Sequence, residues 1–302
     1  MAIVAGERAA AAQQENYVGF AGGDWLMLVG IVATWGPSFL LIDLGLEHLA
    51  PSLVAFGRIA FGAATLGLFP VARRPVERSD WPLVALLGLI WLAIPFLLFA
   101  TAQQWIDSSL AGMINAATPL FTALVAAFLV KQLPSRLQGI GLVVGFLGVV
   151  AVSLPSVGGG SNAAGVGLVL LATVLYGFSF NLLADLQRRN DALAVIWRSQ
   201  LVAVVLVAPV AVAGLASSDF AWSSVLAVAA LGSLSTALAF FWFTALIGRV
   251  GATRAAVALY FVPIVAIALG AALNDEEIHV AALLGTGLVL GGAYMTSRAK
   301  TD

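Results

Sequence analysis

Two arginines lie inside long apolar stretches of this sequence, where a charged side chain is unusual. Arg58 lies about two helical turns into one such stretch, and Arg198 occupies the corresponding place in another. A charge at that depth costs roughly 2–3 kcal/mol or more unless it faces the interior and is paired. Asp43 and Asp185 end the preceding apolar stretches at matching depths. The sequence therefore predicts two ion pairs, Asp43–Arg58 and Asp185–Arg198.

Three roles are open for these pairs. They staple neighbouring helices, they form part of an inner and an outer closure, or the arginines hold the carboxylate of a bound molecule. Pro119 and Pro263 are a second matched pair, because a proline removes one backbone hydrogen bond and bends a helix. Each proline is either a static bend or one of two hinges.

A further group of polar and aromatic side chains lies near the middle of the apolar stretches. Lipid cannot satisfy the hydrogen bonds of the polar ones, so they should face one another around an internal cavity. The predicted wall comprises Trp35, Ser38, Phe39, Trp91, Phe99, Gln103, Asn115, Thr118, Thr122, Tyr176, Ser179, Asn181, Thr236, Phe240, Trp242 and Tyr260. No Asp or Glu lies in the middle third of any stretch, which disfavours a site for a lone cation or a dedicated proton relay. The cavity should suit zwitterions with apolar side chains.

Several other chemistries are excluded. The chain has no cysteine and two histidines, His48 and His279, so neither a thiolate site nor a histidine-rich metal site is expected. There is no Walker motif for ATP, and a net charge of -1 provides no basic field for nucleic acid. We expect no metal, no cofactor and no nucleic-acid partner.

The elements that position these residues follow from composition. Hydrophobic residues make up 61% of the chain and charged residues 10%, against roughly half and a quarter in soluble domains. A membrane-crossing helix needs about 20 mostly apolar residues. With Pro, Gly and charged clusters as boundaries, the sequence predicts ten spans, at 24–43, 52–72, 82–104, 108–130, 136–154, 163–184, 193–214, 222–247, 252–273 and 279–297.

Arginine and lysine then predict the orientation, because they accumulate in cytoplasmic loops. Outside the interiors of the predicted spans, the basic residues occur in every second loop and in the two terminal segments, which places them all on one side of the membrane. They are Arg8, Arg73, Arg74, Arg78, Lys131, Arg136, Arg188, Arg189, Arg249, Arg298 and Lys300. The opposite loops hold Glu47, His48, Asp107, Asp219, Asp275, Glu276 and Glu277 instead. Both termini are therefore expected in the cytoplasm.

The second half of the chain repeats the first. Residues at intervals of 140 to 144 match in order: Trp35-Gly-Pro-Ser-Phe39 with Tyr176-Gly-Phe-Ser-Phe180, Arg58 with Arg198, Trp81 with Trp222, Pro119 with Pro263, and Gly141, Gly148 and Ser153 with Gly285, Gly292 and Ser297. Each half holds an odd number of spans, so the second half enters the membrane from the opposite side. Such inverted repeats underlie alternating access in transporters, whereas enzymes and receptors have no need of them.

These features resemble the drug/metabolite transporter superfamily. The paired arginines and prolines look like those of bacterial amino-acid and metabolite exporters, with the aromatic amino-acid exporters as the nearest likeness. The resemblance implies that spans 1–4 and 6–9 surround a central cavity while spans 5 and 10 lie at the periphery. Glycine-rich faces on spans 5 and 10 suit close helix contacts and are compatible with a homodimer through these spans.

The sequence thus predicts an all-α membrane protein of ten helices in two inverted five-helix repeats. The expected divisions are a cytoplasmic segment 1–23, repeats 24–154 and 163–297, an extracytoplasmic linker 155–162 and a tail 298–302. We expect a secondary-active exporter of amino acids or related metabolites in the bacterial cytoplasmic membrane, with a small-molecule substrate and the lipid bilayer as partners. The alternatives are a multidrug or nucleotide-sugar carrier and, from another class, a membrane-embedded enzyme.

Overall fold

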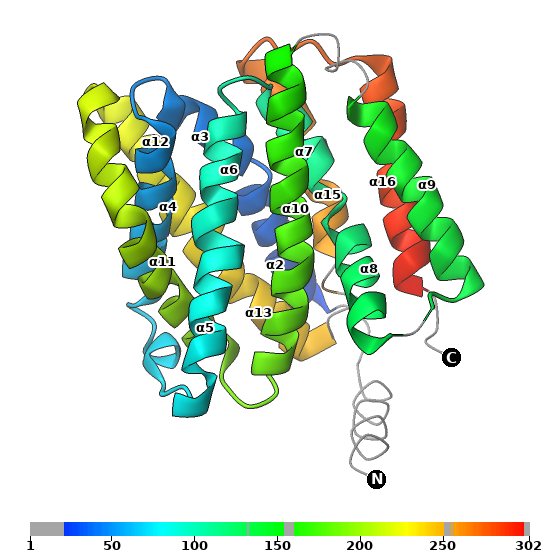
Figure 1. The fold of residues 1–302 in the computed structure, drawn as a ribbon, viewed down its shortest axis with the longest axis horizontal. Helices are drawn as coiled ribbons and strands as arrows, with labels where there is room; N and C mark the ends of the chain where they lie inside the picture. The colour runs from blue at the N-terminus through cyan, green and yellow to red at the C-terminus, as the bar shows by residue number, and fades with distance from the viewer. Residues whose placement is uncertain (1–20, 132, 154–159, 251–254, 256, 299–302) are drawn as a thin grey trace.

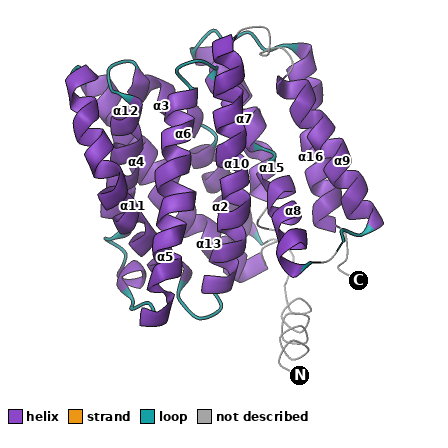
Figure 2. Cartoon of the chain, in the orientation of Figure 1, coloured by secondary structure: helices purple, strands orange, loops and turns teal. Residues whose placement is uncertain are grey.

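The computed structural model describes residues 21–131, 133–153, 160–250, 255 and 257–298, and its regular structure there is helical throughout (Figures 1 and 2). Seven helical segments are long and apolar enough to cross a membrane, and the shorter apolar helices 51–66, 258–273 and 280–296 bring the number to ten. The predicted class, an all-α protein of ten spans, is confirmed. Of the predicted divisions, the segment 1–23, the linker 155–162 and the tail 298–302 lie mostly outside the described residues.

The ten spans comprise single helices and broken ones. In the first repeat they are α2 (Gly22–Trp35) with α3 (Ser38–Leu46), α4 (Pro51–Leu66), α5 (Trp81–Leu87) with η3 (Gly88–Ala93) and α6 (Ile94–Ala102), α7 (Ser108–Asn115) with α8 (Thr118–Val130), and α9 (Arg136–Ser153). In the second they are α10 (Gly160–Leu186), α11 (Ala192–Gly214), α12 (Trp222–Gly232) with η6 (Ser233–Leu238) and α13 (Ala239–Val250), α15 (Val257–Leu273), and α16 (Val280–Arg298). Short 3₁₀ turns flank some spans: η1 (Pro70–Arg73), η2 (Arg78–Asp80) and η5 (Leu215–Ser217).

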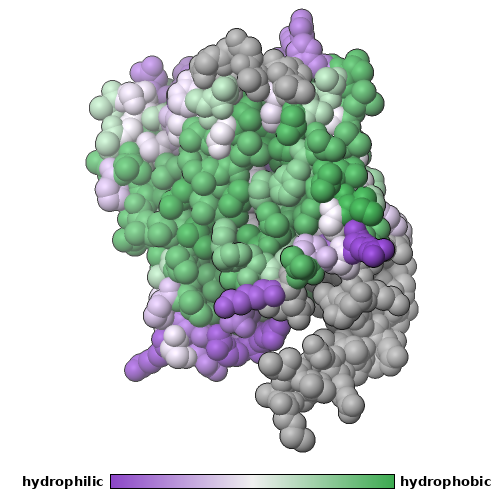
Figure 3. Space-filling view, turned by 45° about the vertical axis from the view of Figure 1, so that its right-hand side comes forward, coloured by the Kyte–Doolittle hydropathy of each residue, from purple (hydrophilic) through white to green (hydrophobic). Residues whose placement is uncertain are grey.

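The two ends of the bundle differ in charge. The loops at the bottom of Figure 1 carry the arginines and form what we call the basic end, defined by Arg73, Arg74, Arg78, Arg188 and Arg189. The loops at the top form the acidic end, defined by Asp107, Asp219, Asp275, Glu276 and Glu277. Between them, Figure 3 shows a broad apolar belt on the molecular surface. Lipid is the environment that such a belt requires.

Spans 1 and 4 are interrupted near the middle of the bundle. In span 1, α2 gives way to α3 at Gly36-Pro37, and the Ser38 hydroxyl donates to the Trp35 carbonyl at 2.6 Å. In span 4, α7 gives way to α8 just before Pro119, and the Thr118 hydroxyl donates to the Asn115 carbonyl at 2.7 Å. A hydroxyl thus satisfies a carbonyl close to each proline, which has no N–H to offer.

Spans 3 and 8, which correspond in the repeat, each contain a π-helical turn, η3 and η6. At η3 the backbone approaches span 7 closely, since a Cβ added at Gly88 would lie 2.6 Å from the Ser199 oxygen. The Ser199 hydroxyl also donates to the Val84 carbonyl at 3.1 Å. At η6 the Thr236 hydroxyl donates to the Leu231 carbonyl, five residues back, at 3.2 Å. Such turns change the direction of side chains and are frequent at functional sites; sequence periodicity gave no sign of them.

Spans 5 and 10 pack against each other along a seam of glycines. A Cβ added at Gly148 would lie 2.6 Å from the Gly285 oxygen, and one added at Gly285 would lie 2.8 Å from the Gly148 oxygen. Gly141 and Gly292 make the same kind of reciprocal approach about two turns further along. The glycine faces of α9 and α16 therefore contact each other within the chain. The homodimer through spans 5 and 10 stays a prediction, and it would have to use other faces of these helices.

Candidate functional site

A cavity lies where the two repeats meet. It holds about 770 Å³ of space not filled by atoms, a volume that includes open solvent. Spans 1, 2, 3, 4, 6, 8 and 9 contribute to its wall. The lining residues are Trp35, Ser38, Phe39, Arg58, Trp91, Phe96, Phe99, Gly112, Asn115, Ala116, Thr118, Pro119, Tyr176, Phe180, Phe240, Leu259, Val262 and Pro263.

Aromatic rings in contact form much of this wall. The Phe99 ring lies 5.8 Å from Tyr176, which stacks on Phe180 with 6.1 Å between centroids and 8° between planes. Trp91 in η3 lies 4.8 Å from Phe240, centroid to centroid. Rings that pack on one another hold their positions without a ligand. The wall therefore presents rigid, flat apolar surfaces.

Arg58 is the one charged residue of the wall. Its Nε donates to the Thr236 hydroxyl at 3.1 Å, and its guanidinium carbon lies 3.8 Å from the centroid of the Phe96 ring. The η6 turn places Thr236 within reach. The predicted Asp43–Arg58 pair is wrong for this structure, because the two side chains point to different neighbours across the same bundle.

Asp43 belongs to a polar layer between the cavity and the acidic end. Gln103 Nε2 donates to the Asp43 carboxylate and to the Phe39 carbonyl, both at 2.8 Å. Asn274 Nδ2 donates to the other Asp43 oxygen at 3.0 Å. Spans 1, 3 and 9 are thus tied together next to the backbone of Phe39, a residue of the cavity wall.

Glu276 adds a second tie at the acidic end, between spans 4 and 9. Its carboxylate accepts from the Ser108 amide at 3.0 Å, the Ser108 hydroxyl at 2.6 Å and the Ser109 amide at 2.9 Å. A carboxylate at the start of α7 is favoured by the free amides and the helix dipole. Burial, and then the charge of Glu276, raises the pKa of the neighbouring Asp107 above its ordinary value.

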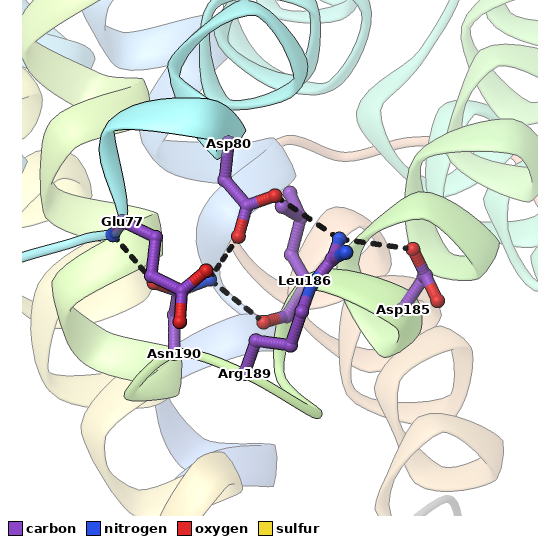
Figure 4. A network of polar contacts seen from close by, with 6 residues as sticks. All are labelled: Glu77, Asp80, Asp185, Leu186, Arg189 and Asn190. Carbon is purple, nitrogen blue, oxygen red and sulfur yellow. Dashed lines mark hydrogen bonds and ion pairs between the residues drawn. The ribbon is translucent and has the colours of Figure 1, made fainter.

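The basic end holds a different network, shown in Figure 4, which joins the loop before span 3 to the loop after span 6. Arg189 contacts the buried Asp80 at 3.0 Å and Asp185 at 3.4 Å, and Asn190 donates to Asp80 at 2.7 Å. At the same end, Arg249 pairs with Asp24 and so joins span 8 to span 1.

The second predicted pair, Asp185–Arg198, is also wrong for this structure. Asp185 binds Arg189 one turn along its own chain, since a residue four positions away is the nearest cation. Arg198 donates instead to the carbonyls of Ala72 and Ala194, both at 3.2 Å. It thereby closes the turn that follows span 2.

The predicted prolines occupy unlike positions. Pro119 is the second residue of α8, directly after the break in span 4, whereas Pro263 lies inside the continuous helix α15. Both line the cavity. Their roles as hinges stay predictions.

The predicted wall residues separate into two groups. Those on the wall are Trp35, Ser38, Phe39, Trp91, Phe99, Asn115, Thr118, Tyr176 and Phe240. The others lie beside the wall. Gln103 and Thr236 bond to the residues named above, and three further side chains donate to backbone carbonyls: Thr122, Ser179 and Asn181. Trp242 packs on Gly30, and Tyr260 packs near the seam of spans 5 and 10. Five members of the second group donate a hydroxyl or amide hydrogen to a helix carbonyl, an alternative that residue type alone does not reveal: Gln103, Thr122, Ser179, Asn181 and Thr236.

Residues that sequence reasoning missed on the wall are mostly apolar: Phe96, Gly112, Ala116, Phe180, Leu259 and Val262. Phe180 ends the repeated run that begins at Tyr176, so the internal repeat did carry a signal for it. Within the described residues, no cluster of three or more His, Asp or Glu forms a metal site.

Comparison with known proteins identifies the family. A model of the EamA-like transporter family matches residues 23–154 and, a second time, residues 163–298. The chain belongs to this family. As an EamA-like transporter it is a multi-pass membrane protein of the drug/metabolite transporter superfamily with two repeats, as the sequence predicted.

Some relatives of this EamA-like transporter have names that mention amino acids, and others are named only as transporters. It is 28% identical to a probable amino-acid metabolite efflux pump of Salmonella typhimurium, over 90% of this chain and 94% of that one. It is 24% identical to a probable terminal-alkyne amino-acid exporter of Streptantibioticus cattleyicolor, over 91% and 93%. A crystal structure at 19% identity covers 91% of this chain and 96% of its own with a TM-score of 0.62, which supports the fold alone.

Proposed function

We propose that this EamA-like transporter is a secondary-active exporter of neutral amino acids, aromatic ones included, with broad specificity. The observation that carries the proposal is the cavity at the junction of two inverted repeats, walled by aromatic rings and free of carboxylates. Flat apolar side chains fit such a wall through stacking and burial. The names of the Salmonella and Streptantibioticus relatives support the same class of cargo.

Alternating access is the proposed mechanism. The ties at the acidic end, Asp43 with Gln103 and Asn274, and Glu276 with Ser108, would close the cavity toward that side and separate when it opens. The contacts of Arg189 and Arg249 would do the same at the basic end. Inverted repeats allow each half to take the conformation of the other in turn. The basic end is proposed to face the cytoplasm of the cell, across the inner membrane, with both termini on that side.

Other functions are less well supported. A nucleotide-sugar carrier would need several cations near one phosphate site, and the wall has one arginine. A multidrug carrier remains compatible with the aromatic wall and is the second candidate. A membrane-embedded enzyme would need a nucleophile with a base or a metal, and the wall residues offer neither.

Counterflow of labelled amino acids into proteoliposomes tests the proposal. We expect uptake of tryptophan, methionine and threonine when the unlabelled amino acid is preloaded. A Phe99→Ala variant should lose most of the tryptophan uptake because Phe99 lies on the wall, and the matched Phe128→Ala variant should retain it because Phe128 is 74% exposed on the lipid-facing side. Absence of counterflow for all twenty amino acids would contradict the proposal and favour a multidrug carrier.

A further inference from the structure

Arg58 is positioned as if to receive an anion. Its Nε is bonded to Thr236, and one face of its guanidinium lies on the Phe96 ring. Among the described residues, neither terminal nitrogen of Arg58 has a hydrogen-bond or ion-pair partner. Neither terminal nitrogen is fully buried. Each keeps some surface open to the cavity that Arg58 lines.

The surroundings hold the guanidinium in place. The Thr236 hydroxyl that accepts from Nε is itself held by the Leu231 carbonyl in the π-helical turn η6. With Nε and one ring face engaged, the remaining free edge is the pair of terminal N–H groups. An arginine fixed in this way loses little entropy when it binds a planar anion through two parallel hydrogen bonds.

The charge of the cavity is unbalanced. The lining residues include one cation, Arg58, and no acid. The Asp43 carboxylate, which the sequence predicted as the partner of Arg58, is engaged by Gln103 and Asn274 instead. A desolvated cation without an anion is costly, so a ligand that brings a carboxylate is favoured. An ammonium group finds neutral acceptors at most, such as the Asn115 side chain.

The matching arginine of the second repeat lacks this arrangement. The terminal nitrogens of Arg198 donate to the carbonyls of Ala72, Arg73 and Ala194, and Arg198 does not line the cavity. The repeat therefore supplies two arginines in corresponding places, and one of them faces the ligand space.

We propose that Arg58 binds the carboxylate of the transported molecule, and that the cavity recognises aromatic carboxylates with no requirement for an ammonium group. This inference rests on the proposed transport function and names its substrate class more closely. Aromatic monocarboxylates are then ligands alongside amino acids, whereas aromatic amines and amides of amino acids are poor ones.

Three analogues of tryptophan test this on the wild-type protein. Indole-3-propionate keeps the carboxylate and lacks the ammonium, tryptamine keeps the ammonium and lacks the carboxylate, and tryptophan amide lacks the negative charge. We expect indole-3-propionate to compete with tryptophan counterflow within about threefold of tryptophan itself. Tryptamine and tryptophan amide should be about 10- to 100-fold weaker, the equivalent of one lost charge-assisted interaction.

Variants then assign the effect to the residue. Arg58→Met should remove the preference for indole-3-propionate over tryptamine, and Arg58→Lys should restore part of it. Arg198→Met is the matched control and should keep the wild-type preference. Because Arg58→Met can impair folding, the ranking of analogues is also measured on purified wild-type protein, by the shift in thermal unfolding temperature.

The outcomes separate the two proposals. Amino-acid counterflow with equal competition by tryptamine and indole-3-propionate would overturn the role of Arg58 and leave the transport function standing. No counterflow, with unfolding stabilised by indole-3-propionate and not by tryptamine, would contradict the amino-acid exporter and support the carboxylate site. Binding of neither analogue would overturn the site.

Discussion

Spans 5 and 10 obey the symmetry of the internal repeat, and so do the π-helical turns of spans 3 and 8, but spans 1, 4, 6 and 9 at the cavity do not. Along the seam of spans 5 and 10, Gly148 approaches Gly285 as Gly285 approaches Gly148. Around the cavity, span 4 is broken before Pro119 while span 9 runs straight through Pro263. Span 1 is broken at Gly36-Pro37, and span 6 is the continuous helix α10.

We infer from this difference that spans 5 and 10 form a static scaffold and that the spans around the cavity move. Two inverted halves of similar sequence can hold a rigid interface in the same way in every state. Under the proposed alternating access, the spans that open and close the cavity would differ between the halves in any single state, because only one end would be open at a time. Loss of symmetry at the cavity is what alternating access requires.

The largest effect is expected at the seam. In a Gly148→Val variant, the Cβ would lie 2.5 Å from the Val289 nitrogen, so backbone has to move and the helices separate. We expect a loss of about 3 kcal/mol or more in stability, seen as a lower unfolding temperature and low yield in the membrane. Gly287→Val is the control, since a Cβ there meets nothing within 4 Å. Equal tolerance at both positions would show that the seam is not a tight contact.

A smaller effect is expected at the acidic end, where the two halves meet asymmetrically. Removal of the Glu276 carboxylate leaves the Ser108 and Ser109 amides without their partner. Loss of charge-assisted bonds worth about 1.5–3 kcal/mol should shift the protein about tenfold or more toward opening at this end. A Ser38→Cys reporter on the wall, modified by a membrane-impermeant maleimide in intact cells, measures it.

The chain has no native cysteine, so the reporter is the sole thiol. Faster modification is expected in Glu276→Ala. The control is Glu277→Ala, because Glu277 is exposed and has no hydrogen bond in the described structure. If both variants react at the unaltered rate, Glu276 does not close the cavity.

The smallest effects are expected at the prolines. Pro263→Ala adds an N–H and removes a ring from the interior of a continuous helix, so we expect stability to rise by about 1–3 kcal/mol and counterflow to slow. Pro119→Ala lies in the first turn of α8, where a missing N–H costs nothing, so stability should be nearly unchanged. Thermal unfolding of both variants checks this; a reversed order would show that the proline positions do not distinguish the two repeats.

Sequence reasoning predicted the ten spans because hydrophobic length and charged boundaries are local properties. It also predicted Trp35, Phe39, Trp91 and Tyr176 on the wall, since the repeat and the membrane depth select them. The length of the second span was overestimated, because a helix over residues 52–72 was expected and α4 ends at Leu66.

The partners of charged residues could not be predicted in the same way. Depth places Asp43 level with Arg58, but hydrogen bonding depends on the direction of each side chain around its helix. Asp43 points to Gln103 and Asn274, and Arg58 points to Thr236. The latter contact depends on a π-helical turn, and a period of 3.6 residues contains no information about such a turn. The contact of Glu276 with Ser108 joins residues 168 apart, and no pattern within either repeat anticipates it.

The indole rings of the wall have an optical consequence. Trp35 and Trp91 line the cavity, whereas Trp25, Trp81, Trp105 and Trp222 are exposed on the outside of the molecule. A ligand that stacks in the cavity displaces water from the first two and leaves these four exposed tryptophans in their surroundings. The intrinsic tryptophan fluorescence of the unlabelled protein should therefore report whether the cavity is occupied. Its time course would follow the filling and emptying of the cavity within a single turnover.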